Sequence, residues 1–402
     1  MRHSLKVAVA AVLVAAAAQP AVADGGPRWV AGWAASPVVG SDIPWSDCPA
    51  GTGLTDQTVR NVVFTSAGGR QVRVRLSNAF GTRPLRVGRA SVAVRASGDA
   101  PVPGTLRGLT FHGRSGVEVP AGREVFSDPV PLSVQALSTL LVSVHLPGPT
   151  GPLTNHPFTA QGNYLAPGDR TRASGGFAGT PCWMVASGVD VAPANRVVGT
   201  VVAFGDSITD TANTTGDANH RWPDFLARRL AAVPGRTLSV VNAGLGGNRL
   251  IADRVGEPYY GVSGVSRVER DVLGQTGVKS VIVLEGVNDI GFDAGAADLV
   301  AGFREVIATV HERGVRVFGG TILPFKGSFV WTPEREATWR AVNEWIRTSG
   351  EFDGVVDFAA ATAVPGDPTT LAPAYDSGDH LHPNDAGTSA MADAVDLAVL
   401  LR

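Results

Sequence analysis

The sequence predicts an all-β domain followed by an α/β domain built on a parallel sheet. From about residue 29 to residue 191, apolar residues recur at every second position, and Gly, Pro, Asn and Asp interrupt them at short intervals. After Arg196, continuous apolar runs alternate with amphipathic helical patterns. Alternation with period two is typical of strands with two different faces, and continuous apolar runs are typical of strands covered on both faces. At 402 residues the chain has room for both domains.

The segment QVRVRLSNAF shows the first pattern. It places Val72, Val74 and Leu76 on one face of a strand and Arg73 and Arg75 on the other. PLRVGRASVAVR and STLLVSVHLPG continue the pattern, and no stretch of this half carries a helical apolar stripe. Many short alternating strands separated by turns predict a β-sandwich of the jelly-roll kind.

The second half alternates buried strands with helices. The expected strands cover 197–204, 237–244, 278–286, 315–323 and 354–358. The expected helices cover 222–233, 297–314, 332–350 and 384–401. Pro223 lies in the first turn of one helix, Thr332 caps another, and Gly314 ends a third. Strands and helices that alternate along the chain predict a parallel sheet between two helical layers.

The N-terminus has the layout of a secretory signal peptide. Basic residues precede the short apolar run VAVAAVLVAAAA, and Ala21-Val22-Ala23 then offers small residues for cleavage. A membrane anchor is the alternative, but the run is shorter than the roughly 20 residues that span a bilayer, and no later stretch is long and apolar enough. We therefore predict an exported protein without a membrane span. The expected divisions are a signal peptide at 1–23, a β-sandwich domain at 24–195 and an α/β domain at 196–402, with DVAPANR (190–196) as the linker.

The net charge bears on the class of binding partner, and the cysteines bear on the redox state of the compartment. The formal net charge is −2, which gives no argument for a nucleic-acid partner. Cys48 and Cys182 are the only cysteines, and in an oxidising compartment a disulfide between them is expected. Two free buried thiols are the alternative.

Polar loops follow the strands of the α/β half, at the edge where such sheets bind ligands. Ser207 comes directly after the first strand, in VVAFGDSITD. A serine hydroxyl is a weak nucleophile until a base takes its proton, and Asp379-His380-Leu381-His382 offers a base. Because His382 follows Asp379 by three residues, a turn can hold both on one side, where the carboxylate fixes the imidazole tautomer.

Acyl transfer also needs donors for the oxyanion that develops on the substrate. The backbone N–H groups of Ser207 and Gly247 can supply two, and the side chain of Asn288 can supply a third. Gly247 lets the backbone approach a substrate without a Cβ in the way. The sequence therefore predicts a Ser–His–Asp site with an oxyanion hole.

The blocks GDS, NAGLGGN, GVND and DHLHP, in this order, resemble those of the SGNH hydrolases, the GDSL esterase/lipase superfamily. The resemblance covers about Thr200 to Leu401. It implies a flavodoxin-like three-layer α/β/α fold and no cofactor. The roles that it implies are Ser207 as nucleophile, His382 as general base, Asp379 as the partner of the base, and Gly247 and Asn288 as oxyanion-hole residues.

Other residues of these blocks have lesser expected roles. Asp206 and Asp289 are expected to shape their loops by hydrogen bonding. Thr211 stands where the family often has glycine, which changes the loop beside the nucleophile but removes no catalytic group. His220 follows that loop and is a candidate for substrate contact.

Other functions explain fewer of these residues. GLGGNR imitates a dinucleotide fingerprint, but Arg249 stands where the third glycine should be. The crowded acidic residues and histidines between 376 and 382 could bind zinc, but a metal hydrolase leaves the serine and the oxyanion donors unexplained. A non-catalytic carbohydrate-binding protein has no use for a base beside a serine. An acyltransferase would use the same triad, with an alcohol in place of water.

The sequence thus predicts a secreted, monomeric serine esterase that acts on a carboxylic ester of a small molecule, a polysaccharide or a lipid. No metal and no cofactor are expected. All four blocks follow Thr200, so the N-terminal half is expected to assist only binding or stability.

Overall fold

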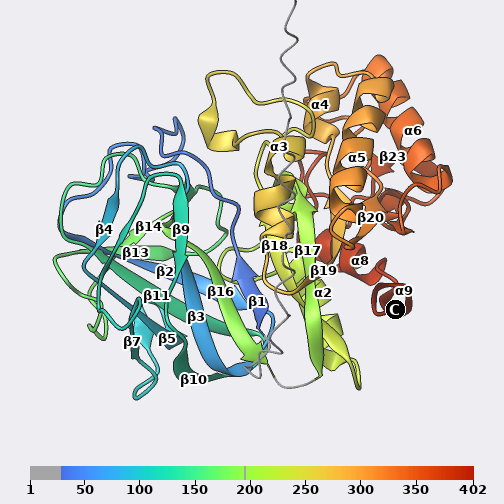
Figure 1. Ribbon diagram of the computed structural model, residues 1–402. Helices are drawn as coiled ribbons and strands as arrows, with labels where there is room; N and C mark the ends of the chain where they lie inside the picture. Colours follow the sequence, from blue (N-terminus) through green and yellow to red (C-terminus); the bar gives the residue numbers. More distant parts are fainter. Residues whose placement is uncertain (1–28, 194–195) are drawn as a thin grey trace, which may run out of the picture.

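The computed structural model describes residues 29–193 and 196–402, and the predicted signal peptide at 1–23 lies outside them. Figure 1 shows a strand-rich N-terminal half (blue to green) beside a C-terminal half that carries the long helices (yellow to red). Two large clusters of buried apolar side chains form the cores of these halves. Within the described ranges, none of the helices has the length and apolar character needed to cross a membrane.

The N-terminal half is built from two main antiparallel sheets. The first has the order β1-β16-β3-β10, with β9 also paired to β3; its strands are β1 (Val30–Ala34), β16 (Ala186–Pro193), β3 (Gly69–Asn78), β10 (Val130–Val134) and β9 (Arg123–Phe126). The second has the order β14-β13-β2-β11-β5-β6, with β7 paired to β5; its strands are β14 (Ala178–Thr180), β13 (Asn163–Pro167), β2 (Gln57–Thr65), β11 (Ser138–Leu146), β5 (Arg89–Ser97), β6 (Ala100–Pro101) and β7 (Arg107–Leu109). Two short pairs complete it: β4 (Leu85–Val87) with β8 (Val117–Val119), and β12 (Asn155–His156) with β15 (Trp183–Met184). The predicted β-sandwich is confirmed.

Strand β3 has the two faces that its alternation predicts. Val72, Val74 and Leu76 are fully buried in the core of the sandwich. The opposite face is covered by the C-terminal half, because the guanidinium of Arg75 donates to the carbonyl of Gly274 at 3.1 Å and is itself buried. Alternation along a strand normally marks one solvated face. Here the charged face is an interface.

The C-terminal half contains a five-stranded parallel sheet in the order β18-β17-β19-β20-β21. Its strands are β17 (Val197–Gly205), β18 (Thr237–Gly244), β19 (Val278–Leu284), β20 (Arg316–Gly320) and β21 (Gly354–Val356). Counted along the chain this order is 2-1-3-4-5, the doubly wound order of flavodoxin-like folds. The expected flavodoxin-like sheet is confirmed.

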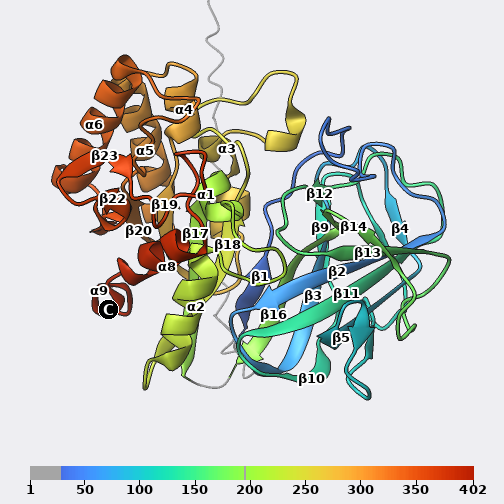
Figure 2. The same ribbon diagram turned by 180° about the vertical axis from the view of Figure 1, so that it is seen from behind.

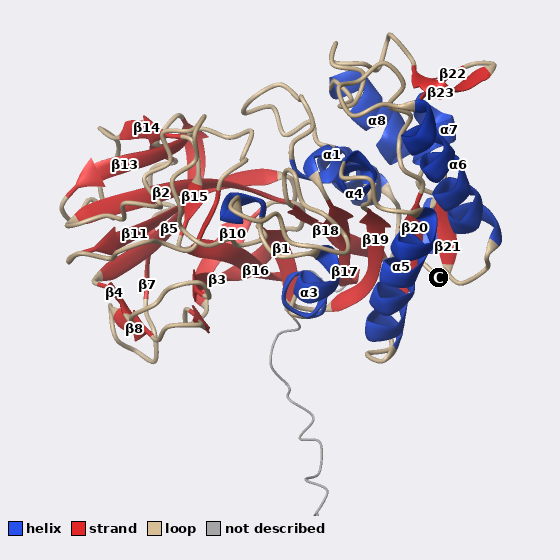
Figure 3. Cartoon of the chain, turned by 90° about the horizontal axis from the view of Figure 1, so that it is seen from above, coloured by secondary structure: helices blue, strands red, loops and turns tan. Residues whose placement is uncertain are grey.

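Helices cover both faces of this sheet. They are α1 (Ser207–Asp210), α2 (Trp222–Ala232), α3 (Gly264–Val268), α4 (Val287–Gly291), α5 (Ala296–His311), α6 (Pro333–Thr348), α7 (Phe358–Thr362), α8 (Asp385–Asp393) and α9 (Leu397–Leu400), with short turns at Pro258–Tyr260 and Glu269–Leu273 and a small hairpin of β22 (Ala363–Val364) and β23 (Asp367–Leu371). Helices α2 and α8 pack together on the face turned toward the viewer in Figure 2. Seen from above, α3 and α5 lie on the opposite face (Figure 3).

Two of the differences from the expected element boundaries have a clear physical cause. The single closing helix predicted at 384–401 is two helices, because the side chain of Asp396 accepts hydrogen bonds from the N–H groups of Ala398 and Val399 and so starts α9. The predicted linker at 190–196 is partly strand, because β16 continues to Pro193 between β1 and β3.

The two halves are joined by buried hydrogen bonds. Ser66 of the N-terminal half accepts from the N–H of Val240 in β18 at 3.0 Å. Ala31 of β1 donates to the carbonyl of Thr276 at 2.9 Å. The Thr276 hydroxyl donates to Asp190 of β16 at 2.7 Å. The N-terminal half is thereby fixed against β18 and against the segment that leads into β19.

Cys48 and Cys182 form the expected disulfide within the N-terminal half. Their Cα atoms are 5.7 Å apart, although 134 residues separate them in the sequence. The bond ties the loop after β1 to the segment before β15.

Candidate active site

Ser207 is the first residue of α1, directly after β17 at the carboxyl edge of the parallel sheet. The preceding Asp206 caps the helix, because its Oδ1 accepts a hydrogen bond from the Ile208 N–H at 2.9 Å. Gly205 permits the tight turn, since a Cβ on it would lie 2.2 Å from the Thr209 hydroxyl. The serine is therefore held half-buried on a turn that only a narrow set of residues can form.

Ser207, His382 and Asp379 form one hydrogen-bonded chain. The Ser207 Oγ lies 2.9 Å from the His382 Nε2. The His382 Nδ1 lies 2.6 Å from the Asp379 Oδ2. The other oxygen of Asp379 accepts from the backbone N–H groups of Leu381 and His382, which orients the carboxylate. The structure thus brings together the three side chains for which the sequence predicts a triad.

The environment of Asp379 keeps it ionised. Partial burial disfavours its charged form, but hydrogen bonds from the His382 ring and backbone, the imidazole charge and the Leu381 N–H together hold the pKa of Asp379 far below its usual value. Asn213 also donates to this carboxylate at 3.2 Å. A charged Asp379 favours the tautomer in which the Nδ1 of His382 carries the proton and the Nε2 is free to accept one from Ser207.

Besides the Ser207 N–H, the predicted oxyanion donors are Gly247, in the loop after β18, and Asn288, in helix α4. Gly247 has a φ of +71°, and a Cβ on it would lie 2.3 Å from the ring of Tyr260, so the position requires glycine. Asn288 lies in α4, and its side-chain amide donates one hydrogen to the carbonyl of Asn248 at 2.9 Å. The second amide hydrogen is available to donate to a substrate oxygen. Over residues 29–193 and 196–402, no acceptor bonds to the backbone N–H of Ser207 or of Gly247.

Asp289 shapes the oxyanion region as expected. Its carboxylate accepts from the backbone N–H groups of Leu250 at 2.7 Å and Ile251 at 3.1 Å. These bonds tie the loop after β18 to α4, so Gly247 and Asn288 are positioned together.

A buried arginine that was not predicted from the sequence lies beneath the turn that carries Ser207. Arg267 is fully buried and donates to the carbonyl of Gly205 at 2.8 Å, to Glu285 at 2.9 Å and to the side chain of Asn248 at 2.7 Å. Burial raises the pKa of Asp206 to about 7, although the hydrogen bond from the Ile208 N–H opposes the shift. Burial and the nearby Asp206 likewise raise the pKa of Glu285 well above its usual value. The segment VSRVERD carries two arginines, and nothing in it indicates that Arg267 is the one buried beneath this turn.

The acidic and histidine residues between 376 and 382 form two separate pairs. His380 is bound by Asp376, with 2.6 Å between the Nδ1 and Oδ2 atoms, and the second pair belongs to the triad chain. In the described part of the chain, no group of three or more His, Cys, Asp or Glu side chains is arranged to hold a metal ion. His220, a candidate for substrate contact, is paired with Asp385 at 2.8 Å.

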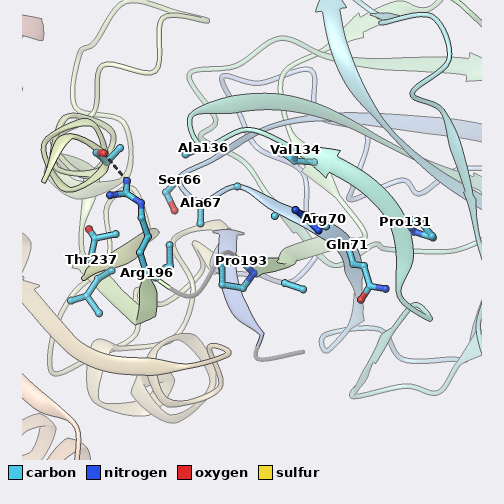
Figure 4. A pocket seen from close by; sticks show the side chains of 16 residues that line it. Ser66, Ala67, Arg70, Gln71, Pro131, Val134, Ala136, Pro193, Arg196 and Thr237 are labelled. Carbon is cyan, nitrogen blue, oxygen red and sulfur yellow. Dashed lines mark hydrogen bonds between the residues drawn. The ribbon is translucent and has the colours of Figure 1, made fainter. Parts of the chain in front are cut away.

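A shallow groove of about 410 Å³ borders the nucleophile helix. It is lined from the N-terminal half by 157–161 and Pro181, and from the C-terminal half by 211–214. A larger cleft opens between the halves at the other edge of the sheet, where β17 and β18 begin (Figure 4). The described residues that line it include no histidine or carboxylate, so that cleft offers no base for the serine.

A doubly wound α/β domain that holds a serine, a histidine and an aspartate in one hydrogen-bonded chain at its carboxyl edge has the architecture of a hydrolase. The model of the GDSL-like lipase/acylhydrolase family matches residues 203–390 and identifies this segment as a domain of that kind. The family expected from the four sequence blocks is thereby confirmed.

The likeness to other known proteins is one of structure and not of sequence. No curated protein matches the chain at a significant level. Similar solved structures include an aryl esterase from M. smegmatis, with 16% identity over 49% of this chain and 95% of that chain and a TM-score of 0.39. They also include a carbohydrate acetylesterase from Sinorhizobium meliloti, with 14% identity over 50% of this chain and 99% of that chain and a TM-score of 0.39.

Proposed function

We propose that the protein is a secreted serine esterase that hydrolyses carboxylic esters through an acyl-enzyme. The observation that carries this proposal is the hydrogen-bonded chain from Ser207 through His382 to Asp379, within a domain of an ester hydrolase family. The distance of 2.9 Å between the serine Oγ and the histidine Nε2 is within reach for direct proton transfer. No cofactor is needed for this chemistry.

The first half-reaction forms the acyl-enzyme. The Ser207 Oγ attacks the carbonyl carbon of the ester while the His382 Nε2 takes the hydroxyl proton. The carbonyl oxygen becomes an oxyanion, which accepts hydrogen bonds from the N–H groups of Ser207 and Gly247 and from the Asn288 amide. The tetrahedral intermediate collapses, the C–O bond to the alcohol breaks, and His382 gives its proton to the departing alcohol.

The second half-reaction returns the free enzyme. His382 takes a proton from a water molecule, whose oxygen attacks the acyl carbon. The oxyanion forms again in the same hole, and its collapse breaks the bond to the Ser207 Oγ. The serine recovers its proton from His382, and the carboxylic acid leaves.

The substrate is a carboxylic ester of a sugar, a lipid or another small molecule. The groove beside α1 is open and shallow, so it can accept a ligand that extends beyond the scissile bond. Rates on p-nitrophenyl esters of increasing acyl length will separate short-acyl from lipid-like substrates. The disulfide between Cys48 and Cys182 supports export to an oxidising compartment.

A serine-reactive phosphonate will test the proposed function. It should inactivate the protein with one adduct per chain, and peptide mass spectrometry should place that adduct on Ser207. The reason is that only a serine with a base beside it reacts quickly with such a reagent. Hydrolysis of esters by a protein that takes up no label, or takes it up elsewhere, would refute the assignment of Ser207.

The rate should fall as the pH drops through the acid range. A general base must be neutral to accept a proton, so protonation of the His382 ring at low pH should stop the reaction. Asp379 does not cause this loss, because its pKa is held far below the usual value. The measurement is kcat/KM on an unactivated ester from about pH 5 to pH 9.

Asp206 is the control for this pH profile, because its pKa of about 7 falls in the same range. The Asp206→Asn variant keeps a side-chain oxygen for the Ile208 N–H and should keep the acid limb. A flat profile in the wild type, or loss of the limb in this variant, would contradict the assignment of the base to His382.

A further inference from the structure

A buried histidine of the N-terminal half reaches into the active-site region of the C-terminal half. His156 lies in β12, and its Nε2 is 2.9 Å from the Oδ1 of Asp210, the last residue of α1. The two side chains are 3% and 2% exposed. No role was predicted from the sequence for either residue, although Asp210 ends the stretch VVAFGDSITD, and neither takes part in the proposed proton transfers.

The surroundings of His156 require both ring nitrogens to carry protons. The Nδ1 faces the backbone carbonyl of Ser36 at 2.7 Å. The Nε2 faces the carbonyl of Phe158 at 2.8 Å as well as the Asp210 carboxylate. Carbonyl oxygens only accept hydrogen bonds, so the two nitrogens can satisfy their neighbours only as donors, which is the imidazolium form. Burial disfavours that charge, but Asp210 and the two carbonyls outweigh it and raise the pKa of His156.

Asp210 links His156 to the loop that contains Gly246 and Gly247. Its other oxygen, Oδ2, accepts the backbone N–H of Gly246 at 2.8 Å. Gly246 directly precedes Gly247, whose N–H is a proposed oxyanion donor. The N-terminal half also packs on this loop, since a Cβ on Gly246 would lie 2.7 Å from the ring of Phe158.

We propose that His156 is a positioning residue for ester hydrolysis: through Asp210 it holds the Gly246–Gly247 backbone in the orientation that binds the oxyanion. The proposal rests on the proposed esterase function. It replaces the expectation that the N-terminal half assists only binding or stability, because that half supplies the imidazolium that holds Asp210 in place.

The consequence of losing His156 follows from electrostatics. Without the imidazolium, Asp210 is a buried carboxylate with no cation beside it, which is unfavourable unless it takes up a proton or turns away. Either change weakens its bond to the Gly246 N–H and frees the loop to shift. Displacement of a catalytic group by about 1 Å can cost about a hundredfold in rate. Because the oxyanion exists only after attack, the loss should fall on kcat and not on KM.

The test is the His156→Gln variant of the full-length protein, assayed on a short p-nitrophenyl ester. We expect kcat to fall about tenfold to a hundredfold with KM within about twofold of the wild type. Affinity for a trifluoromethyl ketone, which forms an oxyanion adduct with the serine, should fall by the same factor as kcat/KM. The control is His145→Gln, because His145 makes a similar bond to Asp56, at 3.0 Å, away from the C-terminal half. This control should keep wild-type kcat.

The Asp210→Asn variant and the double variant complete the test. If His156 acts through Asp210, the double variant should lose no more activity than the worse single variant. Thermal melts will identify a variant that does not fold, and Asp210→Asn decides alone if His156→Gln fails to fold, since it keeps the shape of the side chain. Wild-type kcat in a folded His156→Gln or Asp210→Asn variant, or losses that simply add, would overturn the positioning role. A wild-type protein that neither hydrolyses esters nor is labelled at Ser207 would overturn the proposed function instead.

Discussion

Replacing Ser207 with alanine should lower kcat by about six orders of magnitude, as removal of the nucleophile does in other triads. The hydroxyl is hydrogen-bonded to His382 and supplies the oxygen that is proposed to attack the ester. The turn should survive, because Asp206 caps α1 through its own side chain. The measurement is turnover of an activated ester beside a thermal melt.

Ser115→Ala is the matched control for this experiment. Ser115 is exposed in the N-terminal half, so its loss should leave both rate and melting temperature unchanged. A Ser207→Ala protein with activity near that of the wild type would end the serine-nucleophile proposal. The alternative to test would then be a metal-dependent reaction that involves the neighbouring pair of Asp376 and His380.

Replacing Asp379 with asparagine should lower kcat by about 10⁴-fold, since the equivalent change in a Ser–His–Asp triad keeps the geometry but gives the wrong tautomer. Asparagine is the same shape as aspartate and can still accept the backbone N–H groups of Leu381 and His382 with its oxygen. Its amide nitrogen then faces the Nδ1 of His382 and donates to it. The proton on the imidazole is forced onto the Nε2, which can no longer accept one from the serine.

Asp376→Asn is a close control, because Asp376 also bonds a histidine Nδ1, that of His380, at 2.6 Å in the same loop. This change should leave kcat within about tenfold of the wild type, since the pair does not touch Ser207. Single-turnover labelling by the phosphonate should slow in Asp379→Asn in parallel with kcat. Near-normal turnover of the folded Asp379→Asn variant would mean that another group orients His382.

Much of the fold could be predicted because its signals are local and periodic. The continuous apolar runs of the C-terminal half became the five parallel strands, and the Thr332 cap and the proline after it start α6 at Pro333. His382 and Asp379 could be paired from sequence because three residues separate them, so a single turn joins them. Ser207 could be placed because a strand followed by Gly-Asp-Ser puts the serine at the edge where doubly wound sheets bind ligands.

Element ends were less predictable where one side chain decides them. The closing helix is divided at Asp396, whose carboxylate caps α9 in competition with continuation of α8. A capping residue inside an otherwise helical pattern is compatible with both outcomes, since aspartate is only moderately unfavourable within a helix. Packing of the surrounding chain selects between them.

The two fold classes, the order of the four sequence blocks and the three residues of the proposed triad could be predicted from the sequence, because each depends on neighbours close in the chain or on a strand end. The charged residues beneath and beside the proposed triad were found only in the tertiary structure. Arg267 joins the nucleophile turn to the Asn248 side chain, and His156 meets Asp210 from the other half of the chain, 54 residues away. Single charged residues of this kind belong to no periodic pattern or motif from which their position in the fold could be predicted. A buried charge is tolerated only beside an opposite charge. Asp210 meets His156 from the other half of the chain, and Glu285 reaches Arg267 from another element, so packing decides both pairs.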